Sequence, residues 1–485
     1  MTIETELRAF KTKLRVNEKD YPKQFKYLMN TAKACTYVRN WYVREALKRM
    51  KNDGVTVFSS KEELKKYSPR ELRKVLTALI NSDPNFAWLK GIPSTPRTYV
   101  FEQIQKTYEG SKGVKYNFIF QCKCMAEKIE ERIKKLKEEA SKEGRTLTEE
   151  EIEKEKVFFN GKRAYKPDEL YKVKGFPRFI KEIRHMSFPI DNVIVDSKNK
   201  CIILPASQGN KKFNIPKMES VKVCYYDHDL NPEGMDKSAL YTISYDGQDW
   251  WMSVKQRVEV AKSPVNQKDD ILGIDLGIKT TAYLSNGKKI NNITEDENLK
   301  KLEKRSKYLD ALRKKNLEKS PIEKIKTPWG KAIKPKSAKY KKLTKHIQAI
   351  DNKIMRYKDT LIKQQVAGIF SDNVKGIVFE DFSVEPLKHN KDWSGKVQKI
   401  CIGLTRQLII NKAKSLGIPV MKAPRNFPST QLCSNCGKRN EHMKNNLKER
   451  TFKCEFCGHT LNRDLNASKN LAQLWGSSEL KNWED

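Results

Sequence analysis

The sequence has no uninterrupted apolar run approaching the roughly 18 residues that a membrane-spanning helix needs. Its N-terminus lacks the apolar stretch of a signal peptide, and no lipidation motif or compact basic amphipathic terminus is present to anchor it to lipid. Hydrophobic residues make up 38% of the 485 positions, as in an ordinary globular protein. These absences argue against a membrane partner and predict a cytoplasmic protein.

Acidic residues are scarce relative to basic ones. Lys and Arg number 97 against 60 Asp and Glu, which gives a formal net charge of +37. An excess of this size indicates a polyanion partner, because many phosphates must be neutralised along an extended path. With a lipid surface excluded, we expect that partner to be nucleic acid.

The ten cysteines show no disulfide-rich spacing. Four of them form two CxxC pairs near the C-terminus, while the other six are scattered through the chain. This pattern predicts a reducing compartment and a bound metal rather than a disulfide framework. The scattered cysteines are Cys35, Cys122, Cys124, Cys201, Cys224 and Cys401.

The first half of the chain changes its periodicity twice. Apolar and basic residues alternate from Phe10 to Val16, which predicts a half-buried strand. Helical periodicity follows over residues 21–184, and a Glu- and Lys-rich part at 126–156 predicts a solvated helical hairpin. Short strands then run from 186 to 260 and include a hairpin that turns at Asp246-Gly247. Because the first strand precedes the helices, we expect residues 1–20 and 185–262 to form one small β-barrel with the helical region inserted.

The second half predicts alternating strands and helices. A buried strand at 271–276 leads into a hairpin that turns at Asn286-Gly287, and a second apolar strand covers 374–380. A helix ending at Leu416 and a strand at 418–421 complete a βαβ unit, which favours parallel pairing. Between the hairpin at Asn286-Gly287 and the strand at 374–380, apolar residues spaced by threes and fours predict an antiparallel basic helical hairpin over 300–361. That hairpin either lies on nucleic acid or is a solvated coiled coil with surplus lysine.

Three acidic residues occupy positions where carboxylates are costly. Asp275 and Glu380 end apolar strands, and Asp464 precedes Ala467 and Leu471 on the apolar face of the last helix. Asp275 alone could simply bond nearby backbone amides. Three converging acids instead predict a site for two Mg²⁺ ions, with Mn²⁺ as the alternative, that activates water against a phosphodiester. Asp381 is an alternative to Glu380, but neighbouring strand residues face opposite sides, so only one can join the site, and Glu380 is preferred.

The two CxxC pairs predict a structural zinc ribbon. A glycine follows each pair, and such knuckles let four thiolates reach one ion in a closed tetrahedral site. A redox-active thiol pair is the alternative, which two matched pairs make less favourable. His442 and His459 lie nearby but are not needed as ligands, and the basic run 438–453 suits a nucleic-acid contact. The expected ligands are Cys433, Cys436, Cys454 and Cys457.

Five segments carry a resemblance to a known family. They are GIDLG at 273–277, VFEDF at 378–382, the run from Ser429 to Gly437, the second cysteine pair with its glycine, and Asn462 to Ala467. In this order they resemble the TnpB nucleases of insertion sequences and their descendants, the miniature type V (V-F-like) CRISPR effectors. The resemblance spans residues 270–475 and is weaker upstream.

The resemblance implies a multidomain α/β fold. A helical recognition lobe (21–184) would be inserted in a wedge β-barrel (1–20 and 185–262). A ribonuclease H-like RuvC nuclease domain (263–427 and 461–485) would be interrupted by a zinc ribbon (428–460). Asp275, Glu380 and Asp464 would be its metal-binding catalytic acids.

The resemblance also implies an RNA-guided DNA endonuclease of a prokaryotic cytoplasm or nucleoid, with guide RNA and target DNA as partners. The N-terminal lobes would recognise a short, often T-rich motif beside the target, and guide pairing would supply the remaining specificity. Extra segments at 115–165 and 300–345 favour the CRISPR branch. Some members of that branch act as dimers on one RNA, so a monomer and a homodimer both remain open.

Two rival functions fit parts of the pattern. One is a binding protein for RNA or DNA that keeps the zinc ribbon but does no chemistry, against which the intact acid triad argues. The other is a RuvC-like transposase or resolvase that acts without RNA. The large basic excess suits a structured RNA and counts against that second rival.

Overall fold

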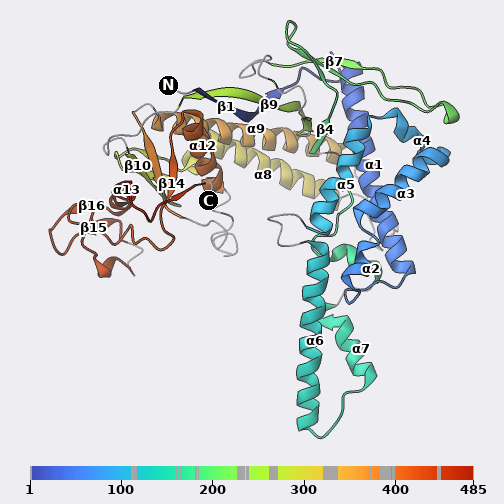
Figure 1. Ribbon diagram of the computed structural model, residues 1–485, viewed down its shortest axis with the longest axis horizontal. Coiled ribbons are helices and arrows are strands. Elements are labelled where there is room, and N and C mark those ends of the chain that lie inside the picture. Colours follow the sequence, from blue (N-terminus) through green and yellow to red (C-terminus); the bar gives the residue numbers. More distant parts are fainter. Residues whose placement is uncertain are drawn as a thin grey trace. The chain divides into compact units, whose positions relative to one another are not determined.

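The computed structural model divides into two compact units, whose elements are labelled in Figure 1. Unit 1 comprises Met1–Glu6 and Val258–Asp485, and unit 2 comprises Leu7–Arg257. None of the described helices is both long and apolar enough to cross a lipid bilayer. The structure describes residues 3–110, 117–159, 162–163, 167–180, 183, 185–226, 235, 240–261, 271–319, 337–370, 373–381, 395, 399–444 and 449–483. The domain boundary predicted at 262/263 and the middle of the 300–345 region lie outside these ranges.

Unit 1 contains a six-stranded sheet in the order β12-β11-β10-β13-β14-β17. The central strands β10, β13 and β14 run parallel, and the others are antiparallel to their neighbours. The predicted hairpin and the predicted βαβ unit are both confirmed, whereas the short last strand was not predicted. The strands are β10 (Ile271–Leu276), β11 (Ala282–Leu284), β12 (Lys289–Ile290), β13 (Gly376–Phe379), β14 (Val420–Lys422) and β17 (Lys481–Asn482).

The two faces of this sheet bury different side chains. Leu272 and Ile274 of β10 share a core with helices α9 (Ala338–Ile369) and α12 (Ile402–Ser415). Ile271 and Val378 pack instead with Leu471 of α13 (Arg463–Gln473). Because side chains alternate along a strand, Asp275 shares the α13 face with Ile271.

Two glycines let α13 approach the sheet closely. A Cβ added at Gly273 would lie 1.9 Å from the Ser468 carbonyl oxygen and 2.5 Å from the Ala472 amide nitrogen. On the neighbouring strand, a Cβ at Gly376 would lie 2.5 Å from the ring of Trp475. Backbone atoms cannot move aside as a flexible side chain can, so the α13 position depends on glycine at 273.

Helices α8 (Glu297–Glu318) and α9 form the predicted antiparallel hairpin. Glu303 pairs with Lys358 at 3.0 Å, and the Ser306 hydroxyl donates to Asp351 at 2.6 Å. From Glu303 to Ser306 the residue number rises on α8, while that of the partner on α9 falls from Lys358 to Asp351, so the two helices run antiparallel. The confirmed hairpin keeps most of its lysines outside its buried seam, which includes Leu309 and Ile347.

Besides the short antiparallel pair β2 (Phe158–Phe159) and β3 (Lys162–Arg163), the described strands of unit 2 form two sheets with one shared core. The first strand, β1 (Ile3–Lys13), is hydrogen-bonded to β9 (Trp250–Ala261) in a sheet of order β1-β9-β8-β4, so the prediction that it joins the β-rich section is confirmed. The second sheet has the order β5-β6-β7, and an isolated bridge joins Leu14 to Tyr225. The remaining strands are β4 (Met186–Ile190), β5 (Ile194–Asp196), β6 (Cys201–Leu204), β7 (Val221–Cys224) and β8 (Tyr241–Tyr245).

Helices make up most of the described chain between β1 and β4. The long α1 packs against α3 and α5, and the predicted Glu- and Lys-rich hairpin is α6 beside the shorter α7 (Figure 1). Ion pairs such as Arg132 to Glu155 at 2.7 Å join the last two helices. The helices are α1 (Pro22–Asn52), α2 (Lys61–Lys65), α3 (Pro69–Ser82), α4 (Pro84–Ala87), α5 (Ser94–Tyr108), α6 (Phe118–Lys142) and α7 (Glu149–Val157).

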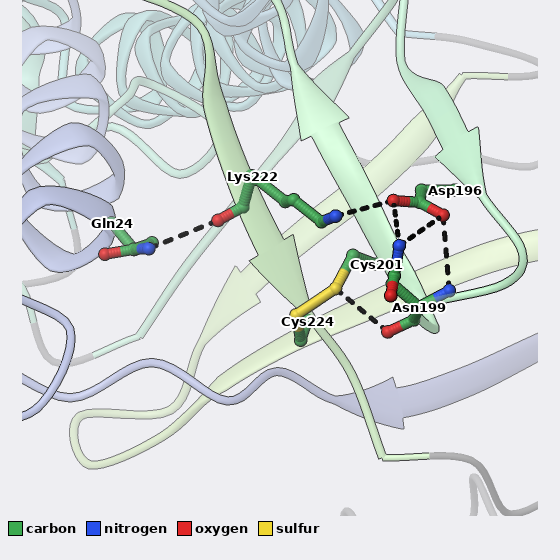
Figure 2. The surroundings of a disulfide bond; sticks show 6 residues. All are labelled: Gln24, Asp196, Asn199, Cys201, Lys222 and Cys224. Carbon is green, nitrogen blue, oxygen red and sulfur yellow. Dashed lines mark hydrogen bonds and ion pairs between the residues drawn. A yellow bond between two sulfur atoms is a disulfide. The ribbon is translucent and has the colours of Figure 1, made fainter.

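The expectation of no disulfide is wrong for one pair. Cys201 of β6 and Cys224 of β7 are bonded, with a Cα–Cα distance of 3.9 Å (Figure 2). They are register partners on adjacent antiparallel strands, so strand pairing brings together residues whose linear spacing gives no hint of contact. Lys222 bonds Asp196 at 2.6 Å on the same sheet, and this bond lowers the pKa of Asp196 to about 2.

Candidate functional site

Asp275 lies near the carboxyl end of β10, on the face covered by α13. It pairs in register with Tyr283 of β11, and only 8% of the residue is exposed. Burial raises the pKa of Asp275 well above the usual carboxyl range, and the charges of Glu380 and Asp464 raise it further. The three predicted acids are thus close enough for each of the other two to act on Asp275.

Glu380 follows β13 directly. Ile274 and Phe379 are register partners on parallel strands, so Asp275 and Glu380 come next at the same edge of the sheet. Burial raises the pKa of Glu380 as well. Two buried carboxyl groups near one another disfavour each other's ionised form, a cost that a bound cation would offset.

Asp464 lies in the first turn of α13. The Asn462 side chain caps this helix by accepting from the Asp464 and Leu465 amides, each at 3.1 Å. Two guanidinium groups neutralise the carboxylate: Arg450 pairs with it at 3.2 Å and Arg463 at 3.3 Å. The charge of Asp464 raises the pKa of Asp275, while its projection toward both other acids stays a prediction.

Asp381 follows Glu380, so alternation along the strand predicts that its side chain faces the opposite side of the sheet. Its charge raises the pKa of Arg406, a residue of α12, although burial lowers that pKa overall. Alternation along the strand places Glu380 on the α13 side of the sheet and Asp381 on the α12 side. The choice of Glu380 over Asp381 as the third acid stays a prediction.

The acids offer only oxygen ligands, which suit hard divalent cations such as Mg²⁺ and Mn²⁺. Burial and the nearby acids disfavour the ionised form of Asp275, a cost that a bound cation would offset, and Asp464 is already paired with two arginines. These features fit a divalent-metal site. The catalytic roles of Asp275, Glu380 and Asp464 stay a prediction.

The four predicted zinc ligands form one cluster. The sulfur atoms of Cys433, Cys436, Cys454 and Cys457 all lie within 4.8 Å of one another. Two of the separations are 3.6 Å, near the roughly 3.8 Å expected between sulfurs on a tetrahedral zinc with 2.3 Å bonds. Among the described residues, no other group of three or more His, Cys, Asp or Glu meets the same distance criterion. Asp275, Glu380 and Asp464 therefore do not meet it.

The cysteine turns have the form that a zinc knuckle requires. Gly437 and Gly458 have φ of +70° and +69°, a left-handed backbone that glycine adopts without strain. Their amides donate to the carbonyls of Cys433 and Cys454 at 2.8 and 3.0 Å. His442 pairs with Glu455 at 2.9 Å, and neither His442 nor His459 belongs to the sulfur cluster.

Several residues around both sites were missed by sequence reasoning. Arg450 was assigned only to a basic run, yet its guanidinium meets Asp464. Asn440 is fully buried and donates to the Cys454 sulfur at 3.6 Å. The signal for Arg463 was its position immediately before Asp464, whereas nothing in the linear sequence indicated Arg450 or Asn440.

Comparison with known proteins supports the resemblance found in the sequence. Residues 403–471 match the family described as Cas12f1-like, TNB domain. A Streptomyces pristinaespiralis protein described as "Putative RNA-guided DNA endonuclease" is 26% identical over 240 residues, which is 50% of this chain and 53% of that protein. The chain therefore spans about half the length of this relative. The resemblance to miniature type V, TnpB-like nucleases is confirmed.

Two solved complexes align with nearly the whole chain. One is the Cas12f1–sgRNA–target DNA complex, with a TM-score of 0.41, 16% identity and coverage of 98% of this chain and 100% of the other. The other is a CRISPR–Cas12f ternary complex, with a TM-score of 0.32, 16% identity and coverage of 96% and 86%.

Proposed function

We propose that this chain, similar to TnpB and miniature type V nucleases, is an RNA-guided DNA endonuclease. The proposal is supported by the placement of Asp275 and Glu380 at the carboxyl ends of paired parallel strands, and of Asp464 in the first turn of α13, the helix that packs on those strands. Acids drawn from positions so far apart gain nothing structurally from burial together, because their like charges raise the cost of ionisation. A bound cation reverses that cost, which makes phosphodiester hydrolysis the natural chemistry of this edge.

The three acids would hold two divalent ions, Mg²⁺ or Mn²⁺. Such ions activate the attacking water and stabilise the leaving oxygen of an in-line displacement. Asp275 and Glu380 would hold the cation as carboxylates, since metal ligation requires the deprotonated form. Arg450 and Arg463 pair with Asp464 and place positive charge beside the site, where a phosphate would lie.

Zinc would be held by the four cysteines in a structural role. Four thiolates complete a tetrahedral shell and leave no open position for substrate, so this site stabilises the ribbon rather than taking part in hydrolysis. The exposed Lys438 and Arg439 beside the first knuckle then remain available for phosphate contacts.

Guide RNA and target DNA would be the partners. The net charge of +37 and the lysine-rich outer surface of the α8–α9 hairpin favour an extended polyanion. In this proposal the helices at 21–184 act as the recognition lobe, the β-rich parts of 1–20 and 185–262 as the wedge, and 263–427 with 461–485 as a RuvC domain interrupted by the ribbon at 428–460. The lobes would read a target-adjacent motif, and one or two copies of the chain would bind each RNA.

The test is reconstitution with native RNA. The chain is expressed together with its flanking genomic DNA, copurifying RNA is sequenced, and the complex is given a DNA library matched to the RNA's variable end. We expect Mg²⁺-dependent cleavage that is lost on RNase treatment. Cleavage that survives RNase would favour the transposase or resolvase function, and tight RNA binding without cleavage of any matched DNA would favour the inactive binding protein.

A further inference from the structure

Helix α13, which carries Asp464, lies between the sheet and the first cysteine knuckle. Its apolar side, with Ala467 and Leu471, is fully buried against the sheet, where Gly273 permits backbone contact. The side next to it is polar. Asn466, Asn470 and Gln473 are spaced by four and three residues, so they form one stripe along the helix.

The amide stripe, meaning Asn466, Asn470 and Gln473, bonds only to backbone of the knuckle segment 429–434. Asn466 donates to the Leu432 carbonyl at 2.6 Å and accepts from the Ser434 amide at 2.9 Å. Asn470 donates to the carbonyls of Leu432 and Ser429, both at 2.7 Å. Gln473 donates to the Ser434 carbonyl at 2.8 Å. Five hydrogen bonds thus join the helix to a segment that includes Cys433 itself.

Because the Asn466 and Asn470 side chains are buried, losing these hydrogen bonds would be costly. Asn466 is 0% and Asn470 3% exposed, so water cannot replace a lost partner on either amide. The knuckle backbone that satisfies the stripe also directs the Cys433 and Cys436 sulfurs toward those of Cys457 and Cys454, at 3.6 Å in each pair. One backbone conformation thus both gathers the zinc ligands and holds α13.

The same ribbon fixes the start of α13 from a second direction. Strands β15 (Thr451–Lys453) and β16 (Thr460–Asn462) pair around the second knuckle, and β16 leads straight into Arg463. The Arg463 amide donates to the Arg450 carbonyl at 2.8 Å, which ties the first turn of α13, the turn that carries Asp464, to the ribbon.

We propose that the zinc knuckle positions Asp464 through the amide stripe, which makes Asn466 and Asn470 positioning residues for the divalent-metal site. This proposal rests on the proposed function for the role of Asp464, but the mechanical link between knuckle and helix is independent of it. Loss of zinc frees the knuckle backbone, the stripe loses its partners, and Asp464 moves relative to Asp275 and Glu380.

The mechanical link is tested by hydrogen exchange on the full chain with its copurified RNA, with and without zinc. We expect zinc removal to accelerate exchange in peptides of α13 as well as in those of the knuckle. In an Asn466→Ala/Asn470→Ala variant that still contains one zinc per chain, α13 should exchange fast already, and zinc removal should add little. Unchanged exchange in α13 alongside a loosened knuckle would overturn the proposal.

The consequence for Asp464 is tested by Mn²⁺ binding, followed by electron paramagnetic resonance. The half-saturating Mn²⁺ concentration should rise about tenfold or more in the double variant, the usual effect of removing groups that orient metal ligands. Gln473→Ala removes one exposed contact and should give a smaller rise. Lys469→Ala, on the same helix but outside the stripe, is the matched control and should leave Mn²⁺ binding unchanged.

These outcomes separate the two proposals. If the wild-type complex binds no Mn²⁺ at Asp275, Glu380 and Asp464, the nuclease proposal fails while the exchange result still decides the link. If Mn²⁺ binds and the double variant binds it equally well, the positioning role fails and the nuclease proposal stands.

Discussion

The cysteine cluster and the acidic edge are both groups of potential metal ligands, but they are assembled in different ways. The four thiols come from two local turns and already lie within 4.8 Å of one another. The three carboxylates come from the ends of two strands and the first turn of a helix; they do not meet that distance criterion, and Asp464 pairs with two arginines. Local turns thus preform a site for a cation, whereas a site built by sheet topology must be completed by the cation itself.

The largest effect should come from breaking the local cluster. Cys433→Ser removes a ligand from a kind of site whose apparent binding free energy is of order 10 kcal/mol in zinc-finger peptides, so we expect complete loss of zinc. Metal analysis of the purified protein and its thermal unfolding measure this. Cys401→Ser, a cysteine outside the cluster, should retain one zinc per chain; equal zinc in both variants would remove the ribbon assignment.

The next effect should come from the acidic edge. Asp275→Ala should reduce Mg²⁺-dependent cleavage at least about 100-fold, more than the 10- to 100-fold typical for groups that merely orient ligands. RNA binding should be unchanged because the fold does not need this charge. Asp381→Ala is the control and should cleave DNA at a rate close to wild type. If the two variants behave alike, Asp275 is not part of the site.

A smaller effect should follow from forcing α13 away from the sheet. Gly273→Ala places a Cβ against the backbone of Ser468 and Ala472, and overpacking of this kind costs about 1–3 kcal/mol. Thermal or denaturant unfolding would report the loss, together with weaker cleavage. Gly368→Ala has open space around its Cβ and no left-handed φ, so it should be neutral or slightly stabilising.

The smallest effect should be a pH dependence without divalent metal. The raised pKa of Asp275 means that its contribution to stability is fully present below the ordinary carboxyl range and is lost as pH rises through the raised value. Asp275→Asn removes this loss. The variant should therefore unfold at a higher temperature than wild type at neutral pH without Mg²⁺, and the difference should shrink on acidification. A difference that grows in acid would contradict the raised pKa.

Periodicity and turn residues predicted local elements in both units. The alternation around Asp246-Gly247 and Asn286-Gly287 identified two hairpins, and apolar runs ending in acids identified β10 and β13. These signals are local, since each depends on residues only a few positions apart. Because parallel neighbours end at the same edge, the proximity of Asp275 and Glu380 followed from the strand order alone.

Contacts that depend on register or on helix faces could not be predicted. Cys201 and Cys224 meet only because β6 and β7 pair at those positions. The amides of Asn466 and Asn470 looked like ordinary polar residues of a surface helix, because no sequence pattern indicates that a knuckle backbone covers them. Arg450 was missed for the same reason, since its partner lies 14 residues away across a hairpin.

The short strand β17 has a practical consequence for anyone shortening or fusing this chain. It pairs with β14, the Trp483 amide donates to the Val420 carbonyl at 3.1 Å, and the Trp483 ring lies 5.5 Å from that of Phe379. Trimming before Lys481 would leave an unpaired strand edge and uncover an aromatic ring one residue from Glu380. Any engineered tail should therefore begin after Trp483 and be joined through a flexible spacer.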